Sequence, residues 1–155
     1  MTPLLQTDVD PAWLDYNGHM NDAAYALAFS RSTDALMDAI GLDAAGRARH
    51  GQTVYTLIAM IHYLHEVHAG AHIAICGRIL EHDAKRMRIW LEMRCGGTLA
   101  ATSEQLLLCV RQKEDGARAA SFAPEVAVRI AAMAAGDGHL PPPEAAGRGV
   151  ALRRR

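Results

Sequence analysis

The chain of 155 residues has few cysteines, almost no net charge and no long apolar run, and each shortage excludes a class of protein. Its three cysteines, Cys76, Cys95 and Cys109, are scattered through apolar stretches, which is typical of reduced thiols in a cytoplasmic protein. A formal charge of −1 argues against nucleic acid as a partner. Because no apolar run approaches the roughly 20 residues that cross a bilayer, we expect no membrane partner either.

Several motifs are lacking as well. We find no CxxC pair, phosphate-binding loop, dinucleotide glycine fingerprint or signal-peptide pattern. Half of the residues are apolar, which suits one globular domain with a real core. We assign residues 1–135 to that domain. Gly136–Arg155 contains proline, glycine and arginine but few large apolar residues, so we predict a flexible tail there.

One long helix is predicted from Asn21 to Ile40. Tyr25, Phe29 and Leu36 recur at helical spacings, and most other positions are small or apolar, so the helix should be largely enclosed. Gly41 provides a natural stop just past its end.

The residues on either side of this helix have the patterns of strands. Short apolar sequence near Leu4–Val9 precedes it, and strands are predicted at Thr53–Leu64, Ala71–Leu80, Met87–Cys95 and Leu99–Arg111, before a short helix that ends near Ala135. Thr53–Leu64 is apolar on both faces, which predicts a central strand. Gly77 and Arg78 suggest a bulge, and Gly96-Gly97 a tight hairpin. We therefore expect an α+β fold with an antiparallel sheet of about five strands wrapped around one helix, and dimerisation to cover the remaining apolar surface.

The turn Asp15-Tyr16-Asn17-Gly18-His19-Met20-Asn21 is the main candidate for chemistry. In the expected layout the N–H groups of Gly18, His19 and Met20 face outward at the helix N-terminus, where they could hold an oxyanion. Asp15 could then attack a thioester or ester carbonyl directly, or deprotonate water. The alternative is a plain helix cap.

Further candidates have simpler explanations beside the functional one. Glu104 lies in a mostly apolar row, so it must be paired, protonated or functional. Lys85 and Arg86 can bind nucleotide phosphates, although charged turns are usually only solvated. Tyr16 and Tyr25, with Trp13 and Tyr55, offer aromatic faces near the turn, but core packing explains them better than a cation cage does.

Four histidines, His62, His65, His68 and His72, raise the question of a metal. On a strand the first two point to opposite faces, and the later two fall in a turn, so their donors should not converge as zinc requires. We therefore expect no metal.

The motif around Asp15 resembles that of the hotdog-fold thioesterases of the 4-hydroxybenzoyl-CoA thioesterase-like group. The Asp-x-x-Gly-His-x-Asn pattern is present as Asp15, Gly18, His19 and Asn21, followed by Tyr25. More closely, the chain resembles the betainyl-CoA thioesterases of carnitine degradation, also found fused to carnitine dehydrogenase. The similar segments are Trp13–Asn21, Tyr63–Val67, Asp83–Arg86 and Ala101–Leu108.

The resemblance implies a role for each matching position. Asp15 would be the catalytic carboxylate, the backbone of Gly18 and His19 would hold the thioester oxygen, and Asn17 and Asn21 would orient the turn. It also implies a dimer or tetramer, with CoA bound across a subunit interface and no cofactor. Two departures concern Ile58, where relatives tend to have Glu, and Cys109-Val110-Arg111, where they tend to have His-Val-Asp.

The sequence thus predicts an acyl-CoA thioesterase acting on a short acyl group such as betainyl. Two alternatives stay open: an enoyl-CoA hydratase-like enzyme, for which His19 is available, and a non-catalytic acyl-CoA binding module.

Overall fold

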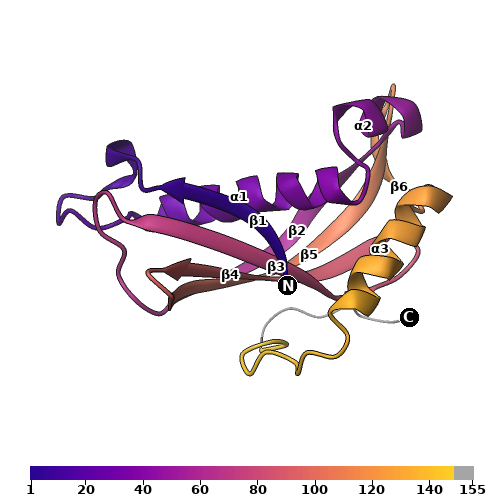
Figure 1. The fold of residues 1–155 in the computed structure, drawn as a ribbon. Helices are drawn as coiled ribbons and strands as arrows, with labels where there is room; N and C mark the ends of the chain where they lie inside the picture. Colours follow the sequence, from indigo (N-terminus) through magenta and orange to yellow (C-terminus); the bar gives the residue numbers. More distant parts are fainter. Residues whose placement is uncertain (149–155) are drawn as a thin grey trace. The chain divides into compact units, whose positions relative to one another are not determined.

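The computed structural model describes residues 1–148, and its elements follow the predicted order of strand, helix and sheet (Figure 1). In chain order they are β1 (Thr2–Asp8), the short 3-10 helix η1 (Pro11–Trp13), α1 (Asp22–Ala39), α2 (Ala44–His50), β2 (Gln52–Tyr63), β3 (His72–His82), β4 (Arg86–Cys95), β5 (Thr98–Lys113), β6 (Gly116–Ala119) and α3 (Pro124–Gly136). No helix within residues 1–148 is long and apolar enough to cross a bilayer.

The chain divides into two compact units that share its longer elements. The first comprises Met1–Leu36, Ile61–Gly77 and Leu91–Ser103; the second comprises Met37–Met60, Arg78–Trp90 and the chain from Glu104 onward.

Helix α1 agrees with the prediction to within one residue at each end. The residues chosen from their spacing are buried, with Phe29 and Leu36 each 1% exposed and Tyr25 4% exposed. Gly41 adopts a φ of +86°, the left-handed conformation that ends many helices. Helix α2, which was not predicted, follows the cap residue Asp43 and is terminated by Gly51, which is also left-handed.

The sheet has six strands in the order β1-β3-β4-β5-β2, with β6 paired to the end of β5. Strand β1 is antiparallel to β3, and β6 is antiparallel to β5. The prediction that Thr53–Leu64 is a central strand is wrong, since β2 lies at an edge of the sheet. A sequence that is apolar on both faces shows only that the strand has much apolar surface, and a strand at the edge can have as much as one at the centre.

Local irregularities of the sheet were only partly predicted. The irregularity near Gly77 lies in β1, where the register shifts between Pro3 and Leu5, and not in β3. The loop Gly96-Gly97 joins β4 to β5 with positive φ at both residues, as a two-residue hairpin of type I′ requires.

Strand β4 shows the predicted alternation on one face. Met87, Ile89, Leu91 and Met93 are each fully buried. On the other face Arg88 is only 8% and Trp90 2% exposed.

Part of the predicted tail makes hydrogen bonds within the second unit. An Nη2–H of Arg78 donates to the Pro141 carbonyl at 2.7 Å, and the Gly147 N–H donates to Glu104 at 3.0 Å. The domain boundary at residue 135 stays a prediction, and residues 149–155 of the tail lie outside the described residues.

Candidate active site

The turn that carries Asp15 is a short hairpin. The Asp15 N–H donates to the His19 carbonyl at 2.8 Å, and the Gly18 N–H donates back to the Asp15 carbonyl at 3.1 Å. Leu14 and Met20 form a bridge just outside it. This pattern is that of a three-residue hairpin loop, which needs a left-handed residue at its third position. Gly18 provides that residue with a φ of +78°.

The Asp15 carboxylate is bound by two backbone N–H groups of its own turn. Its Oδ1 accepts from the Asn17 N–H at 2.8 Å and from the His19 N–H at 3.1 Å. These bonds favour the charged form, and the His19 N–H, the largest cause, lowers the pKa of Asp15 below its ordinary value. Asp15 is therefore an ionised carboxylate at neutral pH.

The predicted row of three outward-facing N–H groups is not present. The Gly18 N–H is used within the turn, and the Met20 N–H donates to the Val67 carbonyl at 2.7 Å. Because α1 begins at Asp22, these donors belong to the hairpin and not to the first turn of the helix. Of the three, only the His19 N–H faces a side-chain acceptor, which can move away by rotation.

Asn21 has the geometry of the cap that the sequence offered as an alternative. Its Oδ1 accepts from the Ala23 N–H at 2.9 Å, and its own N–H donates to the Trp13 carbonyl at 2.8 Å. Asn17 approaches Asp15 with its side-chain amide as well, at 3.5 Å. Tyr16, predicted to contact substrate, is 97% exposed at the tip of the turn.

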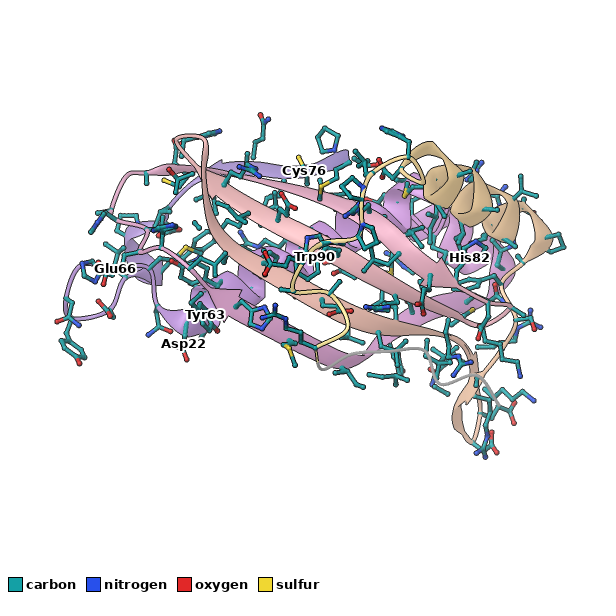
Figure 2. The ribbon with its side chains drawn as sticks, turned by 90° about the horizontal axis from the view of Figure 1, so that it is seen from below. Asp22, Tyr63, Glu66, Cys76, His82 and Trp90 are labelled. Atoms are coloured by element: carbon teal, nitrogen blue, oxygen red, sulfur yellow. The ribbon has the colours of Figure 1, made fainter. Side chains whose placement is uncertain are left out.

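A cavity of about 310 Å³ opens beside Asp15 within the first unit. It is lined by Asp15, His19, Met20, Asp22, Tyr25, Tyr63, Leu64, His65 and Glu66. The rings of Tyr25 and Tyr63 meet edge to face, with centroids 5.2 Å apart. Figure 2 shows Asp22, Tyr63 and Glu66 at the same end of the first unit. The cavity thus combines three carboxylates with two aromatic rings.

Sequence reasoning had found Asp15, His19 and Tyr25 but had given no role to Asp22, Tyr63 and Glu66. Tyr63 and Glu66 belong to a segment more than 35 residues further along than Tyr25. The available signal was the family-like stretch Tyr63–Val67, whose Val67 carbonyl binds the Met20 N–H and so joins this segment to the turn.

Glu104 lies in the second unit and is not among the residues that line this cavity. Its side chain is fully buried, forms an ion pair with Arg88 and accepts from the Gly147 N–H. Arg88 also pairs with Glu81 at 2.9 Å. The carboxylate therefore has the partners that burial demands, and this favours a structural role over contact with substrate.

The charged turn at Lys85 and Arg86 is organised by Asp83. The carboxylate of Asp83 accepts from both backbone N–H groups and forms an ion pair with Arg86 at 2.6 Å. Burial raises the pKa of Asp83, but the hydrogen bonds and the charge of Arg86 together lower it below its ordinary value. Lys85 is exposed on the same turn.

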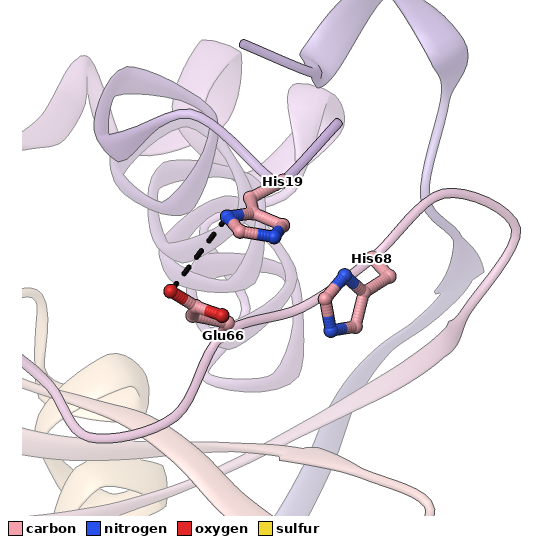
Figure 3. A group of neighbouring side chains, drawn as sticks. All are labelled: His19, Glu66 and His68. Carbon is pink, nitrogen blue, oxygen red and sulfur yellow. Dashed lines mark ion pairs between the residues drawn. The ribbon is translucent and has the colours of Figure 1, made fainter. Parts of the chain in front are cut away.

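A cluster of possible metal ligands lies beside the cavity (Figure 3). It consists of His19, Glu66 and His68, whose ligand atoms all lie within 4.8 Å of one another. Among residues 1–148, only His68 of the four histidines considered from the sequence belongs to such a cluster.

Comparison with known proteins gives the class of this fold, which is that of the hotdog thioesterases. The family model for the thioesterase-like superfamily matches residues 9–130. The betainyl-CoA thioesterase of Pseudomonas aeruginosa is 44% identical over 149 residues, covering 95% of this chain and 92% of that protein. A fused L-carnitine dehydrogenase/betainyl-CoA thioesterase of Rhizobium meliloti is 33% identical, and the match covers 97% of this chain but 30% of that longer protein.

Solved structures agree with these matches. A candidate thioesterase from Pseudomonas putida KT2440 is 35% identical with a TM-score of 0.80, over 98% of this chain and 97% of the other. A hypothetical protein from Staphylococcus aureus, solved in complex with CoA, is 26% identical with a TM-score of 0.86, over 98% and 96% of the two chains. The chain belongs to the thioesterase-like superfamily, which confirms the resemblance found in the sequence.

Proposed function

We propose that this protein hydrolyses an acyl-CoA thioester to a free acid and CoA, and that its substrate is betainyl-CoA. The observation that carries the proposal is an ionised Asp15 at the wall of a cavity that also holds two tyrosines and two further carboxylates. The betainyl-CoA thioesterase of Pseudomonas aeruginosa supports the choice of substrate.

Asp15 has two routes to the thioester carbon. It can attack directly, giving an anhydride that water then opens, or it can take a proton from the water that attacks. In both routes a new C–O bond replaces the C–S bond, and CoA leaves as a thiolate that takes up a proton. The His19 N–H is the donor for the developing oxyanion, once the Asp15 carboxylate turns away from it.

The acyl group would lie among Tyr25, Tyr63, Asp22 and Glu66. A betainyl group ends in a quaternary ammonium ion, which cannot donate hydrogen bonds and is recognised by aromatic faces and nearby negative charge. Tyr63 is 53% exposed and so presents much of its surface to a ligand. Each cation–ring contact contributes about 0.5–2 kcal/mol. Relatives tend to have Glu at the position of Ile58. This arrangement does not require a carboxylate there, because Asp22 and Glu66 supply the negative charge.

The test measures release of free thiol from two substrates of the same shape, betainyl-CoA and its uncharged analogue tert-butylacetyl-CoA. We expect the wild type to prefer the charged substrate at least about 10-fold in kcat/KM, the equivalent of one or two cation–ring contacts. Tyr63→Leu should remove most of this preference. Val128→Ala, which changes an exposed apolar residue of α3 outside the cavity, is the control.

Asp15→Asn tests the chemistry separately. It should lower kcat about 10²–10⁴-fold, the usual contribution of a positioned base, while the amide oxygen still accepts from the turn. A protein that binds acyl-CoA but releases no thiol from any substrate would be a binding module, and the enzyme proposal would be abandoned.

We further propose a homodimer in which β2 is covered. This edge strand carries Tyr55, Leu57 and Ile58, each between 43% and 51% exposed, an unusual amount of large apolar surface for an edge. Light scattering should give at least twice the mass of one chain, and Leu57→Asp should lower it. A wild-type monomer would contradict this.

The same proposal includes the arrangement of the fold, a residue that binds CoA and the location of the protein. The hotdog arrangement, with the sheet wrapped around α1, is supported by the burial of Phe29, Leu36 and Ile40. Lys85 is the candidate for the CoA phosphates. A cytoplasmic location suits the three free thiols.

A further inference from the structure

We propose that His19, Glu66 and His68 form a binding site for a divalent transition-metal ion such as Zn²⁺, and that the bound ion inhibits hydrolysis. The first part rests only on the geometry of these side chains. The second part rests on the proposed function.

The backbone brings the three side chains to one face. His19 and His68 are opposite each other in an antiparallel bridge, which sets their Cβ atoms about 4.5–5.5 Å apart. Glu66 precedes His68 by two residues and therefore projects to the same side, while Val67 between them is buried. The hydrogen bond from the Met20 N–H to the Val67 carbonyl fixes this register.

The side-chain distances suit a single small ion. Zinc bonds of about 2.0–2.2 Å in a tetrahedral site place neighbouring ligand atoms about 3.4 Å apart. His19 Nδ1 and Glu66 Oε1 are already 3.7 Å apart. The rings of His19 and His68 meet edge to face at 4.8 Å between centroids, and His68 is exposed, so a small rotation brings its nitrogen to bonding distance.

The chemistry of the donors selects the ion. Two imidazoles and one carboxylate suit zinc, copper or nickel better than magnesium or calcium, which prefer oxygen ligands. Three protein ligands with a fourth position left to water is the composition of open zinc sites. Because these three ligands come from two distant segments, no motif with a fixed spacing predicts the site from the sequence.

Two of the three ligands also line the cavity beside Asp15. An ion held there takes Glu66 away from a cationic acyl group and adds positive charge to a cavity that would receive a quaternary ammonium. Zinc should therefore compete with betainyl-CoA, raising KM without lowering kcat.

The binding experiment is calorimetric titration of the metal-free protein with zinc chloride. We expect one ion per chain, and visible absorption of a four-coordinate Co²⁺ complex when cobalt is used instead. His68→Gln should weaken binding at least about 100-fold, since losing even an outer partner of a metal ligand costs 10–100-fold. His82→Gln, which changes an exposed histidine outside the cluster, should bind zinc as the wild type does.

The inhibition experiment adds zinc to the thiol-release assay. Zinc should raise KM for betainyl-CoA, a chelator should restore it, and His68→Gln should hydrolyse normally but resist zinc. A wild type that takes up no zinc, or a His68→Gln variant that binds it equally well, overturns the site. Binding without inhibition keeps the site and overturns its effect. If no acyl-CoA is hydrolysed, the proposed function fails, while calorimetry and the cobalt spectrum still decide the metal site.

Discussion

Replacing Arg88 by methionine tests why Glu104 is charged and buried. Arg88→Met retains the unbranched, largely apolar stem of the side chain but removes the guanidinium group and its charge. Glu104, with a side chain that is 0% exposed, would then keep the Gly147 N–H at 3.0 Å as its one hydrogen-bond donor among residues 1–148. Glu81, the other partner of Arg88, is 37% exposed and can be solvated instead.

The expected cost follows from these two environments. Removing one member of a buried pair costs about 3–5 kcal/mol, because the other charge stays buried without compensation. The exposed pair with Glu81 adds at most about 1 kcal/mol. In a protein of this size each kcal/mol lowers Tm by about 2–4 °C, so we expect a fall of roughly 6–24 °C.

Urea unfolding of the single and double variants is the assay. In Arg88→Met/Glu104→Leu neither charge remains, so the free energy of unfolding should return to within about 2 kcal/mol of the wild type. This double variant should also release thiol at a normal rate. The reasoning is refuted if Arg88→Met is as stable as the wild type, or if the stable double variant has lost hydrolysis, which would give Glu104 a role at the substrate.

Three further predictions concern the turn and a buried thiol. Gly18→Ala should lower the free energy of unfolding in urea by about 1–2 kcal/mol. The whole cost comes from the φ of +78°, because no atom lies within 4 Å of the added Cβ, and Gly18→Asn should cost less. The pKa of Asp15 is lowered, so kcat/KM should stay level as the pH falls to about 5 and decline only below the ordinary value of 3.8; a decline centred above that value would contradict the ionised carboxylate. Burial raises the pKa of Cys109 to about 11, so mass spectrometry should find it unmodified by a thiol reagent at neutral pH until the protein is unfolded, and rapid native labelling would be the contrary result.

The parts of the fold that sequence predicted are those with a strong period. Helix α1 and the buried face of β4 repeat apolar residues over several turns or alternations, and both were placed correctly. Helix α2 is only seven residues long and has no apolar stripe, so it was missed. Strand β2 was recognised but was assigned to the centre of the sheet instead of its edge, because an apolar sequence shows how much apolar surface a strand has and not which strands pair with it.

The site was predicted to the extent that it is local in sequence. Asp15 and His19 lie within one turn, and the motif pointed to both. Tyr63 and Glu66 reach the same cavity from a distant segment. Glu104, likewise, pairs with Arg88 on another strand and accepts from the N–H of Gly147, which lies 43 residues further along the chain. Such contacts between distant segments arise from tertiary structure and produce no motif with a fixed spacing in the sequence.

The ionised state of Asp15 also bears on the end of the reaction. The substrate enters with an uncharged thioester, but hydrolysis converts that group into a carboxylate beside an existing one. Two like charges then compete for the His19 N–H, which already donates to Asp15 at rest. The hairpin therefore favours departure of the acid it helps to make, and inhibition by product should be weak.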